Sequence, residues 1–443
     1  MTTATENSPA YQHLLDNSRI TRAHVLLLLT CFCLNMVDGY DVLSIAFAAP
    51  PLASEWGLKP ESLGLLLSAG VFGMTLGAMF LAPLTDTLGR RRMVLAAVMV
   101  MGFSMIMSSR AAGLTELIAL RVLTGLGTGA MLASLTALIS DFFPARNREL
   151  AIGITLAGYP MGATLGGFLA AKLIPNYGWQ GVFMAGGIAT LLLLPVIVAY
   201  LPESVHFLMR RRPHDFLQKA NTVLGRLELA PMASVPDMRE AIEKASVGSL
   251  LAASRRNMTL WLWSGFFLTF GTLYFLLSWI PKLLVDSGVD LSIAIYASSF
   301  FNLAGALGNV GMGALSRRAG LGYSILAFAT LSALFMIVFA VMSLDTMVIL
   351  TLAALIGFFQ QGALVGFYIL AARVYPPEIR ATGVGWGIGL GRFGAVIAPY
   401  LGGLMVAAGL DITTLFTIYA VPLIAAGLIG LAICRRYLDA ESA

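Results

Sequence analysis

Two carboxylates, Asp38 and Asp41, lie inside an apolar run that extends from residue 25 to residue 49. They are three positions apart, so on a helix they share one face, and Gly39 between them lets another helix or a ligand come close. Burial and a like-charged neighbour both favour the protonated form of a carboxyl group. We therefore expect one or both aspartates to carry a coupling proton. The alternative is that one of them braces a helix by contacting an arginine or Asn35.

A cation also falls inside an apolar run, where Arg392 lies among glycines in GIGLGRFGAVIAP. Its planar guanidinium matches a carboxylate in two parallel hydrogen bonds, which suits it to hold an anionic ligand. A permanent ion pair with Asp38 or Asp41 is the alternative. Both interpretations hold if the substrate anion and the proton compete for the same arginine–aspartate pair. A charge at mid-membrane costs about 2.5–3.5 kcal/mol, so each of these residues needs a partner or a wet cavity.

Further polar and aromatic residues within the apolar runs are candidates for lining the same cavity. Amides are rarely placed at mid-membrane without a partner, which singles out Gln360 and Gln361. We expect substrate contacts from Arg392 and from six others: Tyr40, Tyr159, Tyr274, Gln360, Gln361 and Trp386. Trp279, Asn302 and Tyr368 are weaker candidates, and each residue of this group can equally pack against a helix or face lipid.

Composition predicts the elements that hold these residues. Of the 443 residues, 58% are hydrophobic and only 12% are charged, whereas a soluble domain carries about 25% charged residues. A spanning helix needs roughly 20 apolar residues, and we expect an all-α membrane protein with twelve such runs. They are 25–49, 62–84, 93–109, 114–138, 150–171, 180–201, 258–281, 291–315, 321–342, 347–372, 382–407 and 412–434. At 1.5 Å per residue, Asp38 lies roughly 20 Å and Arg392 about 15 Å into a core of about 30 Å.

Charge placement predicts the orientation. With both termini in the cytoplasm, most arginines fall in inner loops, and the outer loops keep only Lys59, Arg110, Lys172 and Lys282. This is the positive-inside bias of membrane proteins. The net charge of +5 then reflects inner loops beside an anionic leaflet, and we expect no nucleic-acid partner.

A polar segment divides the twelve runs six and six. We expect a cytoplasmic tail at 1–24, a six-helix half at 25–201, a cytoplasmic loop at 202–257, a second half at 258–434 and a cytoplasmic tail at 435–443. The first residues lack the short apolar core of a secretory signal.

The two halves carry an internal repeat, in which 142–167 match 374–399 at a constant offset of 232 positions. The matched pairs are Pro144 with Pro376, Arg148 with Arg380, Gly153 with Gly385 and Gly162 with Gly394. Chance similarity between glycine-rich helices is the alternative, but so many matches in one register favour duplication. Repeats of this kind are typical of secondary transporters, so we expect matching structural or gating roles for the two arginines.

Three short motifs lie outside the repeat. LAPLTDTLGRRR carries Asp86, Gly89, Arg90 and Arg91 between the second and third runs. The glycine permits a tight turn and the aspartate can pair with an arginine or a helix N-terminus, which suits a latch on one conformation. RVLTGLGTG begins with Arg121, which either braces helix ends or takes part in proton coupling. PES at 202–204 marks the end of the sixth run.

Taken together, these residues resemble a known family. The segment with Asp86, Gly89 and two arginines resembles the inner-loop signature of the major facilitator superfamily, from which Ala82 and Thr87 depart. RVLTGLGTG resembles a second motif of that superfamily. With DGYD at 38–41, PES and GRFGAVIAP, the chain resembles the aromatic acid:proton symporter family from about residue 24 to residue 436.

The resemblance implies twelve transmembrane helices in two six-helix pseudo-symmetric halves, which is the major facilitator fold. It also implies import of a benzoate-like or hydroxybenzoate-like acid with protons across a bacterial inner membrane. Asp38 and Asp41 would be the essential aspartates, Asp86 and Gly89 the inner-loop gate, and Arg121 and Arg392 the functional arginines. The residues alone indicate an anion and a proton but not an aromatic ring.

Other functions stay open. A symporter of another organic anion keeps the fold, and a proton-coupled exporter usually carries a better-formed motif than GITLAGYPMGATLGG in the fifth run. A membrane enzyme is disfavoured because the four histidines fall outside the runs, and a sensor because the 202–257 loop is small. Cys31, Cys33 and Cys434 form neither a disulfide framework nor a metal site. We expect no cofactor and a monomer.

Overall fold

The computed structural model is helical throughout the part of the chain that it describes. That part comprises residues 15–16, 18–211, 215–229, 231, 247–253, 255–341 and 345–438. Most of the expected tails and much of the expected 202–257 loop lie outside it. So do the side chains of Asp86, Ala133, His206, Arg210, Val247, Pro377, Glu378 and Ala381.

The first half contains five long helices. They are α2 (Arg22–Trp56), α3 (Pro60–Leu76), α5 (Arg90–Ser108), α6 (Leu114–Phe142) and α7 (Ala145–Tyr200). Residues 77–84 continue α3 in irregular helical turns, and the short α4 (Thr85–Leu88) leads into α5.

The second half contains six long helices. They are α11 (Arg256–Asp286), α12 (Leu291–Ala319), α13 (Leu321–Val341), α14 (Thr346–Val374), α15 (Pro377–Ala407) and α16 (Ile412–Ile433). Three short helices lie in the described residues between the halves: α8 (Val205–Arg211), α9 (Phe216–Arg226) and α10 (Val247–Leu250).

Eleven helices in the described residues are long and apolar enough to cross a membrane. One of them, α7, has 56 residues and breaks at Gly178, whose φ of +64° is in the left-handed region that favours glycine. At 1.5 Å per residue it is about 84 Å long, enough for two crossings. The break falls between the expected fifth and sixth spans, so the expectation of twelve spans and an all-α membrane fold is confirmed.

The ends of α2 differ from the expected 25–49. The helix starts at Arg22, so His24, expected outside the spans, is buried in its first turn. It also runs through Pro50 and Pro51. Proline removes a backbone hydrogen bond, but neighbouring helices compensate for it within a membrane bundle. Gly57, with a φ of +58°, ends the helix.

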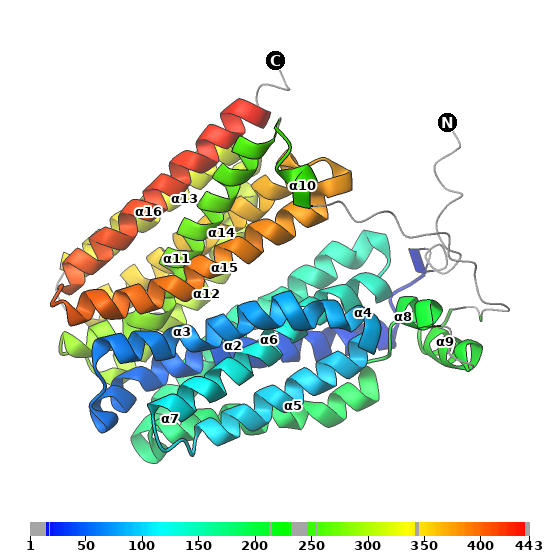
Figure 1. Cartoon of the computed structure of the whole chain (residues 1–443), viewed down its shortest axis with the longest axis horizontal. Coiled ribbons are helices and arrows are strands. Elements are labelled where there is room, and N and C mark those ends of the chain that lie inside the picture. Colours follow the sequence, from blue (N-terminus) through cyan, green and yellow to red (C-terminus); the bar gives the residue numbers. More distant parts are fainter. Residues whose placement is uncertain are drawn as a thin grey trace.

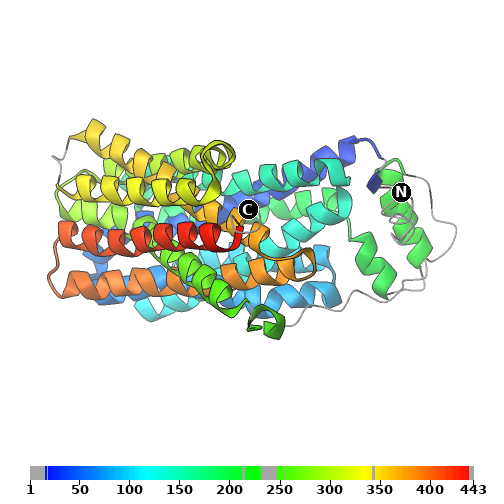
Figure 2. The same ribbon diagram turned by 90° about the horizontal axis from the view of Figure 1, so that it is seen from above.

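The helices form two bundles. In Figure 1 the ribbons of α2–α7 lie below those of α11–α16, and they diverge toward the end that carries α4, α8 and α10. Figure 2 shows α8 and α9 at this same end, beyond the long helices. At the other end the bundles touch: a Cβ added to Gly64 of α3 would lie 3.0 Å from the Cα of Gly403 of α15. Between α7 and α12, the rings of Phe168 and Tyr296 lie 5.5 Å apart.

The repeat-related segments make matching contacts. Pro144 precedes the first residue of α7 and Pro376 that of α15. Arg148 donates to the carbonyl oxygen of Phe143 at 3.5 Å, and Arg380 donates to that of Tyr375 at 3.3 Å. Each arginine therefore bonds the backbone five residues earlier, at equivalent positions of the two halves.

Glycines bring α2 and α7 into close contact. A Cβ at Gly162 would lie 1.7 Å from the carbonyl oxygen of Met36, and one at Gly39 would lie 2.0 Å from that of Tyr159. Small residues allow such approach between membrane helices, where packing replaces the hydrophobic driving force. This close contact sets where the side chains around Gly39 lie.

Candidate functional site

The two aspartates of α2 are both 1% exposed but have different partners. Arg121 of α6 donates from Nη1 to Oδ1 of Asp41 at 2.7 Å, and from Nη2 to the Asp41 carbonyl oxygen at 3.0 Å. The guanidinium also lies 5.6 Å from the centre of the Phe183 ring. Asp41 and Arg121 therefore form a closed ion pair inside the first bundle.

Asp38 has no such partner. Both of its carboxylate oxygens are buried, and neither makes a hydrogen bond with the described residues. Its polar neighbours are Thr128 of α6 and the charged groups of Asp41 and Arg392. An unpaired buried carboxylate is costly, so the first bundle holds an acid whose charge is free to respond to a proton or a ligand.

Arg392 projects from α15 of the second bundle toward this acid. It makes no ion pair and no hydrogen bond with the described residues, and its Nη1 is buried without a partner. It interacts electrostatically with Asp38, Tyr159, Tyr274 and Tyr368. The permanent Arg392–aspartate pair that the sequence left open is therefore absent from the described part of the chain.

Aromatic side chains surround this charged pair. Tyr159 of α7 and Tyr274 of α11 interact with each other and with both charges. The Phe270 ring lies 6.2 Å from the Tyr274 ring and 6.5 Å from the Tyr368 ring of α14, and Phe266 lies 5.5 Å from Tyr368. An aromatic wall, defined here as Phe266, Phe270, Tyr274 and Tyr368, therefore adjoins a free guanidinium.

Phe266 and Phe270 were not among the sequence candidates. They precede Tyr274 at intervals of four residues on one helix, and residues four apart share a helix face. That spacing, beside the arginine, is the signal from which the wall could have been predicted.

Other candidates are used within the protein. The Tyr40 hydroxyl donates to the carbonyl oxygen of Val182 at 2.7 Å. Gln360 donates to the carbonyl oxygen of Thr269 at 3.0 Å and accepts from Ser332 at 3.4 Å. These contacts anchor both side chains to neighbouring helices.

Two further candidates lie apart from these contacts. The Gln361 amide packs against Gly305 of α12, where an added Cβ would lie 2.2 Å from it. Trp386 is 41% exposed and its ring lies 6.2 Å from that of Trp263. Within the described residues, neither side chain forms a hydrogen bond with Arg392 or Asp38.

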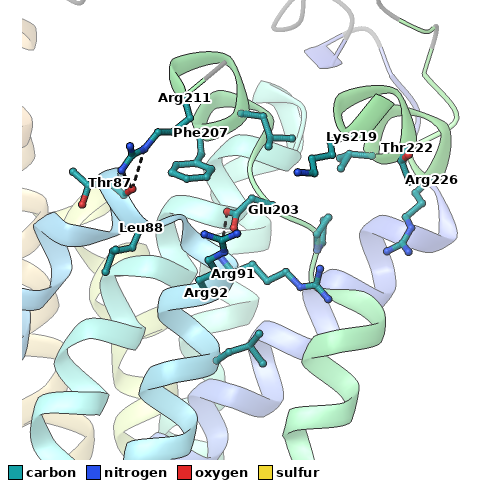
Figure 3. Close-up of a pocket in the computed structure, with 14 residues that line it drawn as sticks. Thr87, Leu88, Arg91, Arg92, Glu203, Phe207, Arg211, Lys219, Thr222 and Arg226 are labelled. Carbon is teal, nitrogen blue, oxygen red and sulfur yellow. Dashed lines mark hydrogen bonds between the residues drawn. The ribbon is translucent and has the colours of Figure 1, made fainter. Parts of the chain in front are cut away.

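The inner-loop motif forms a polar network at the diverging end of the first bundle (Figure 3). Gly89 has a φ of +99° between α4 and α5, which only glycine adopts readily. The first turn of α5 has no capping side chain of its own; instead Glu203 accepts from the backbone nitrogens of Arg90 at 2.8 Å and Arg91 at 3.2 Å. This capping role of Glu203 was not predicted. The sequence signal for it is that the residue before α5 is Gly89, which has no side chain to cap the helix.

The same network ties α5 to α6. The Arg90 guanidinium pairs with Asp141, which also accepts from the Ser204 hydroxyl. The Asp86 side chain lies outside the described part of the chain, so its expected latch contact stays a prediction.

Comparison with known proteins decides the family. The model of the Major Facilitator Superfamily matches residues 28–353. The chain belongs to the major facilitator superfamily. A gallate transporter of Pseudomonas putida is 36% identical over 421 residues, covering 94% of this chain and 93% of that protein. The 4-hydroxybenzoate transporter PcaK of the same species is 33% identical over 414 residues, covering 93% and 92%.

Solved structures agree on the fold. A bacterial homologue of the human lysosomal transporter Spinster, in an inward-facing and unoccupied conformation, matches this superfamily member with a TM-score of 0.73. The match covers 95% of this chain and 99% of that one at 18% identity, which shows the fold alone. The expected resemblance to a family of aromatic acid transporters is confirmed by the relatives, and so is a transporter rather than an enzyme.

Proposed function

We propose that the protein imports an aromatic carboxylate of the benzoate or hydroxybenzoate type together with protons, by alternating access. The observation that carries the proposal is the pair of opposite charges, Asp38 and Arg392, which face each other from the two bundles without an ion pair. Relatives named for gallate and 4-hydroxybenzoate support the substrate class.

In this proposal Arg392 binds the substrate carboxylate and the aromatic wall receives the ring. A guanidinium forms two parallel hydrogen bonds to a carboxylate, and offset or edge-to-face ring contacts stabilise an aromatic ligand. The hydroxyl groups of Tyr159 and Tyr274 lie beside the arginine and can bond to ring substituents. Gln361 and Trp386 stay candidates for further contacts.

Proton coupling follows from competition for the arginine. When Asp38 is protonated, its neutral form leaves Arg392 free to bind the substrate anion. After the substrate departs on the inner side and Asp38 loses its proton, the two charges attract and the empty carrier can return. Asp41 shares in the coupling only if its bond to Arg121 opens during the cycle.

The setting of the transporter is part of the proposal. The positive-inside bias supports a cytoplasmic position for both termini and for the end that carries α4, α8 and α9. A bacterial inner membrane suits a proton-driven importer, and a monomer contains both bundles that the mechanism needs.

The deciding test is uptake of labelled gallate, 4-hydroxybenzoate and benzoate by cells that express the full chain. We expect uptake of at least one of these acids, and its loss when a protonophore collapses the proton gradient. Asp41→Asn and Asp38→Asn are measured beside the native chain, with membrane content determined for each variant.

The outcomes separate the alternatives. Well-expressed protein that takes up none of the ring acids would favour another organic anion, and faster loss of preloaded acid would favour an exporter. Uptake that is unchanged by the protonophore and by both substitutions would overturn proton coupling.

Asp38→Asn has a more specific expected outcome. The neutral amide mimics the protonated acid, so substrate still binds and exchanges across the membrane, but accumulation driven by the proton gradient is lost. The measurement compares counterflow of labelled acid with net uptake in proteoliposomes, at several pH values. Loss of counterflow and uptake together, in a folded variant, would contradict this role.

A further inference from the structure

A cavity lies at the diverging end of the first bundle, and neither Asp38 nor Arg392 lines it. Its volume is about 810 Å³, and it opens between the α4–α5 turn, α8 and α9 (Figure 3). It is lined by Thr87, Leu88, Arg91, Arg92, Leu95, Pro202, Glu203, Phe207, Leu208, Arg211, Lys219, Thr222, Val223 and Arg226. We call it the basic cavity.

The charges of the basic cavity select an anion. Five lining residues are cationic, namely Arg91, Arg92, Arg211, Lys219 and Arg226, against one carboxylate, Glu203. That carboxylate is occupied by the backbone of α5. Arg92 makes no hydrogen bond or ion pair with the described residues, and the Nε of Arg91 is buried without a partner. Such donors match the oxygens of a phosphate group.

An apolar cavity adjoins the basic one. It measures about 310 Å³ and shares the lining residues Pro202, Val223 and Arg226. Its other walls come from the first turns of α2 (Ala23, Leu26 and Leu27), the end of α7 (Ala199 and Tyr200) and Leu227 just after α9. An acyl chain can bury its apolar surface in this cavity, whereas a soluble phosphate compound has no apolar chain to place there.

The helix that closes both cavities is itself amphipathic. In α9, Phe216, Val223 and Leu224 are buried, whereas Lys219 and Arg226 are exposed. The apolar face of α9 therefore packs against the protein, and its basic face is left open to a ligand. Arg226 stands between the two cavities and donates weakly to the carbonyl oxygen of Ala199, at 3.4 Å.

We propose that these two cavities together bind one anionic phospholipid of the adjacent leaflet. Its phosphate lies among Arg91, Arg92 and Arg226, and one acyl chain lies in the apolar cavity beside Leu26 and Tyr200. Basic pockets between transmembrane helices are known to select anionic headgroups. The lipid thereby joins α9 to the inner ends of α2, α5 and α7.

The test uses the purified full chain in detergent and native mass spectrometry. It is titrated with dioleoyl phosphatidylglycerol, with dioleoyl phosphatidylcholine and with soluble glycerol 3-phosphate. We expect phosphatidylglycerol to bind about tenfold or more tightly than phosphatidylcholine, since each cation near an anionic lipid adds severalfold to the affinity. Glycerol 3-phosphate, which lacks the chains, is expected to bind far more weakly.

Two variants locate the site. Arg92→Gln removes a cation that makes no hydrogen bond or ion pair with the described residues, so it should leave folding intact while lowering phosphatidylglycerol affinity several-fold. Leu26→Trp fills the apolar cavity and should lower the affinity for both lipids. Arg318→Gln is the matched control, because this exposed arginine at the end of α12 lines neither cavity.

The proposal fails if the two lipids bind equally, or if Arg92→Gln and Arg318→Gln have the same effect. It also fails if glycerol 3-phosphate binds as tightly as phosphatidylglycerol, because the ligand would then be a soluble phosphate compound. Should Leu26→Trp not fold, Ala199→Phe fills the same cavity from α7 and tests whether an acyl chain binds there.

Discussion

Asp38 and Asp41 are the same residue type, one helical turn apart and equally buried, yet their chemistry differs through their partners. The Asp41 carboxylate receives a hydrogen bond from Arg121, while neither oxygen of Asp38 has a partner in the described chain. A carboxylate that is paired with an arginine stabilises the contact between two helices, whereas an unpaired carboxylate is available to bind a ligand or a proton. The neighbouring helix, not the residue type, therefore divides the roles.

At this scale we expect Asp41→Asn to destabilise the protein more than Asp38→Asn. Removing one partner of a buried ion pair leaves the other charge uncompensated, at a cost of about 3–5 kcal/mol. The measurement is thermal stability in detergent for both variants. Replacing both partners, in Asp41→Leu/Arg121→Met, should recover much of the loss. Equal stability of the two single variants would contradict a structural role for the pair.

Arg392 gives a second prediction at the residue scale. Arg392→Lys keeps the charge but loses the planar fork, so KM for the aromatic acid should rise roughly tenfold, the effect of one lost charge-assisted hydrogen bond. Arg392→Gln should raise it further. Arg317→Lys, at the exposed end of α12, is the control. An unchanged KM in the glutamine variant would show that the carboxylate binds elsewhere.

The sequence could identify which charges matter but not which of them meet. Asp38, Asp41, Arg121 and Arg392 stand out because a charge is costly in an apolar run. Their pairing depends on the rotation and depth of α6 and α15 relative to α2, which a single sequence does not encode in any short pattern. The bond from the Tyr40 hydroxyl to the carbonyl oxygen of Val182 is a contact of the same kind, which depends on how α7 packs against α2.

At the scale of elements, apolar length and composition predicted the spans, whereas local rules misplaced their ends. Pro50 and Pro51 end a helix in most soluble proteins, but α2 continues to Trp56 because its neighbours support it. The repeat was readable from Pro144 and Pro376, since a proline just before a helix start is a local signal.

The contact between α2 and α7 gives a prediction for these elements. Gly162→Ala places a methyl group where the Met36 carbonyl oxygen lies, so the helices must separate, at a cost of about 1–3 kcal/mol. Gly153→Ala is a matched control on the same helix, because nothing lies within 4 Å of an added Cβ there. Thermal stability and uptake should fall in the first variant and hold in the second. Equal stability and uptake of the two variants would show that α2 and α7 do not pack tightly at Gly162.

At the scale of the whole molecule, the two bundles touch at one end and diverge at the other. Contacts between α3 and α15 and between α7 and α12 close the end opposite α8 and α9. In the proposed cycle, these contacts must break to admit a substrate.

A cross-link across the touching end should therefore stop transport. Phe168→Cys/Tyr296→Cys, in a chain without its three native cysteines, is treated with a short bifunctional thiol reagent that forms reducible disulfides. We expect uptake to be lost after treatment and restored by a reductant, while either single variant is unaffected. Uptake that persists in the cross-linked protein would mean that this end does not open.

The corner at Gly178 has a consequence for how the chain tolerates change. The helix resumes immediately after Gly178. There the indole nitrogen of Trp179 donates to Oε2 of Glu55 at 2.8 Å, and the Trp179 ring packs against that of Trp56. Each residue inserted after that anchor would turn everything downstream by about 100°. The number of residues after Gly178 therefore sets which face of the second part of α7 packs against α5. It also sets where Glu203 lies relative to the first turn of α5.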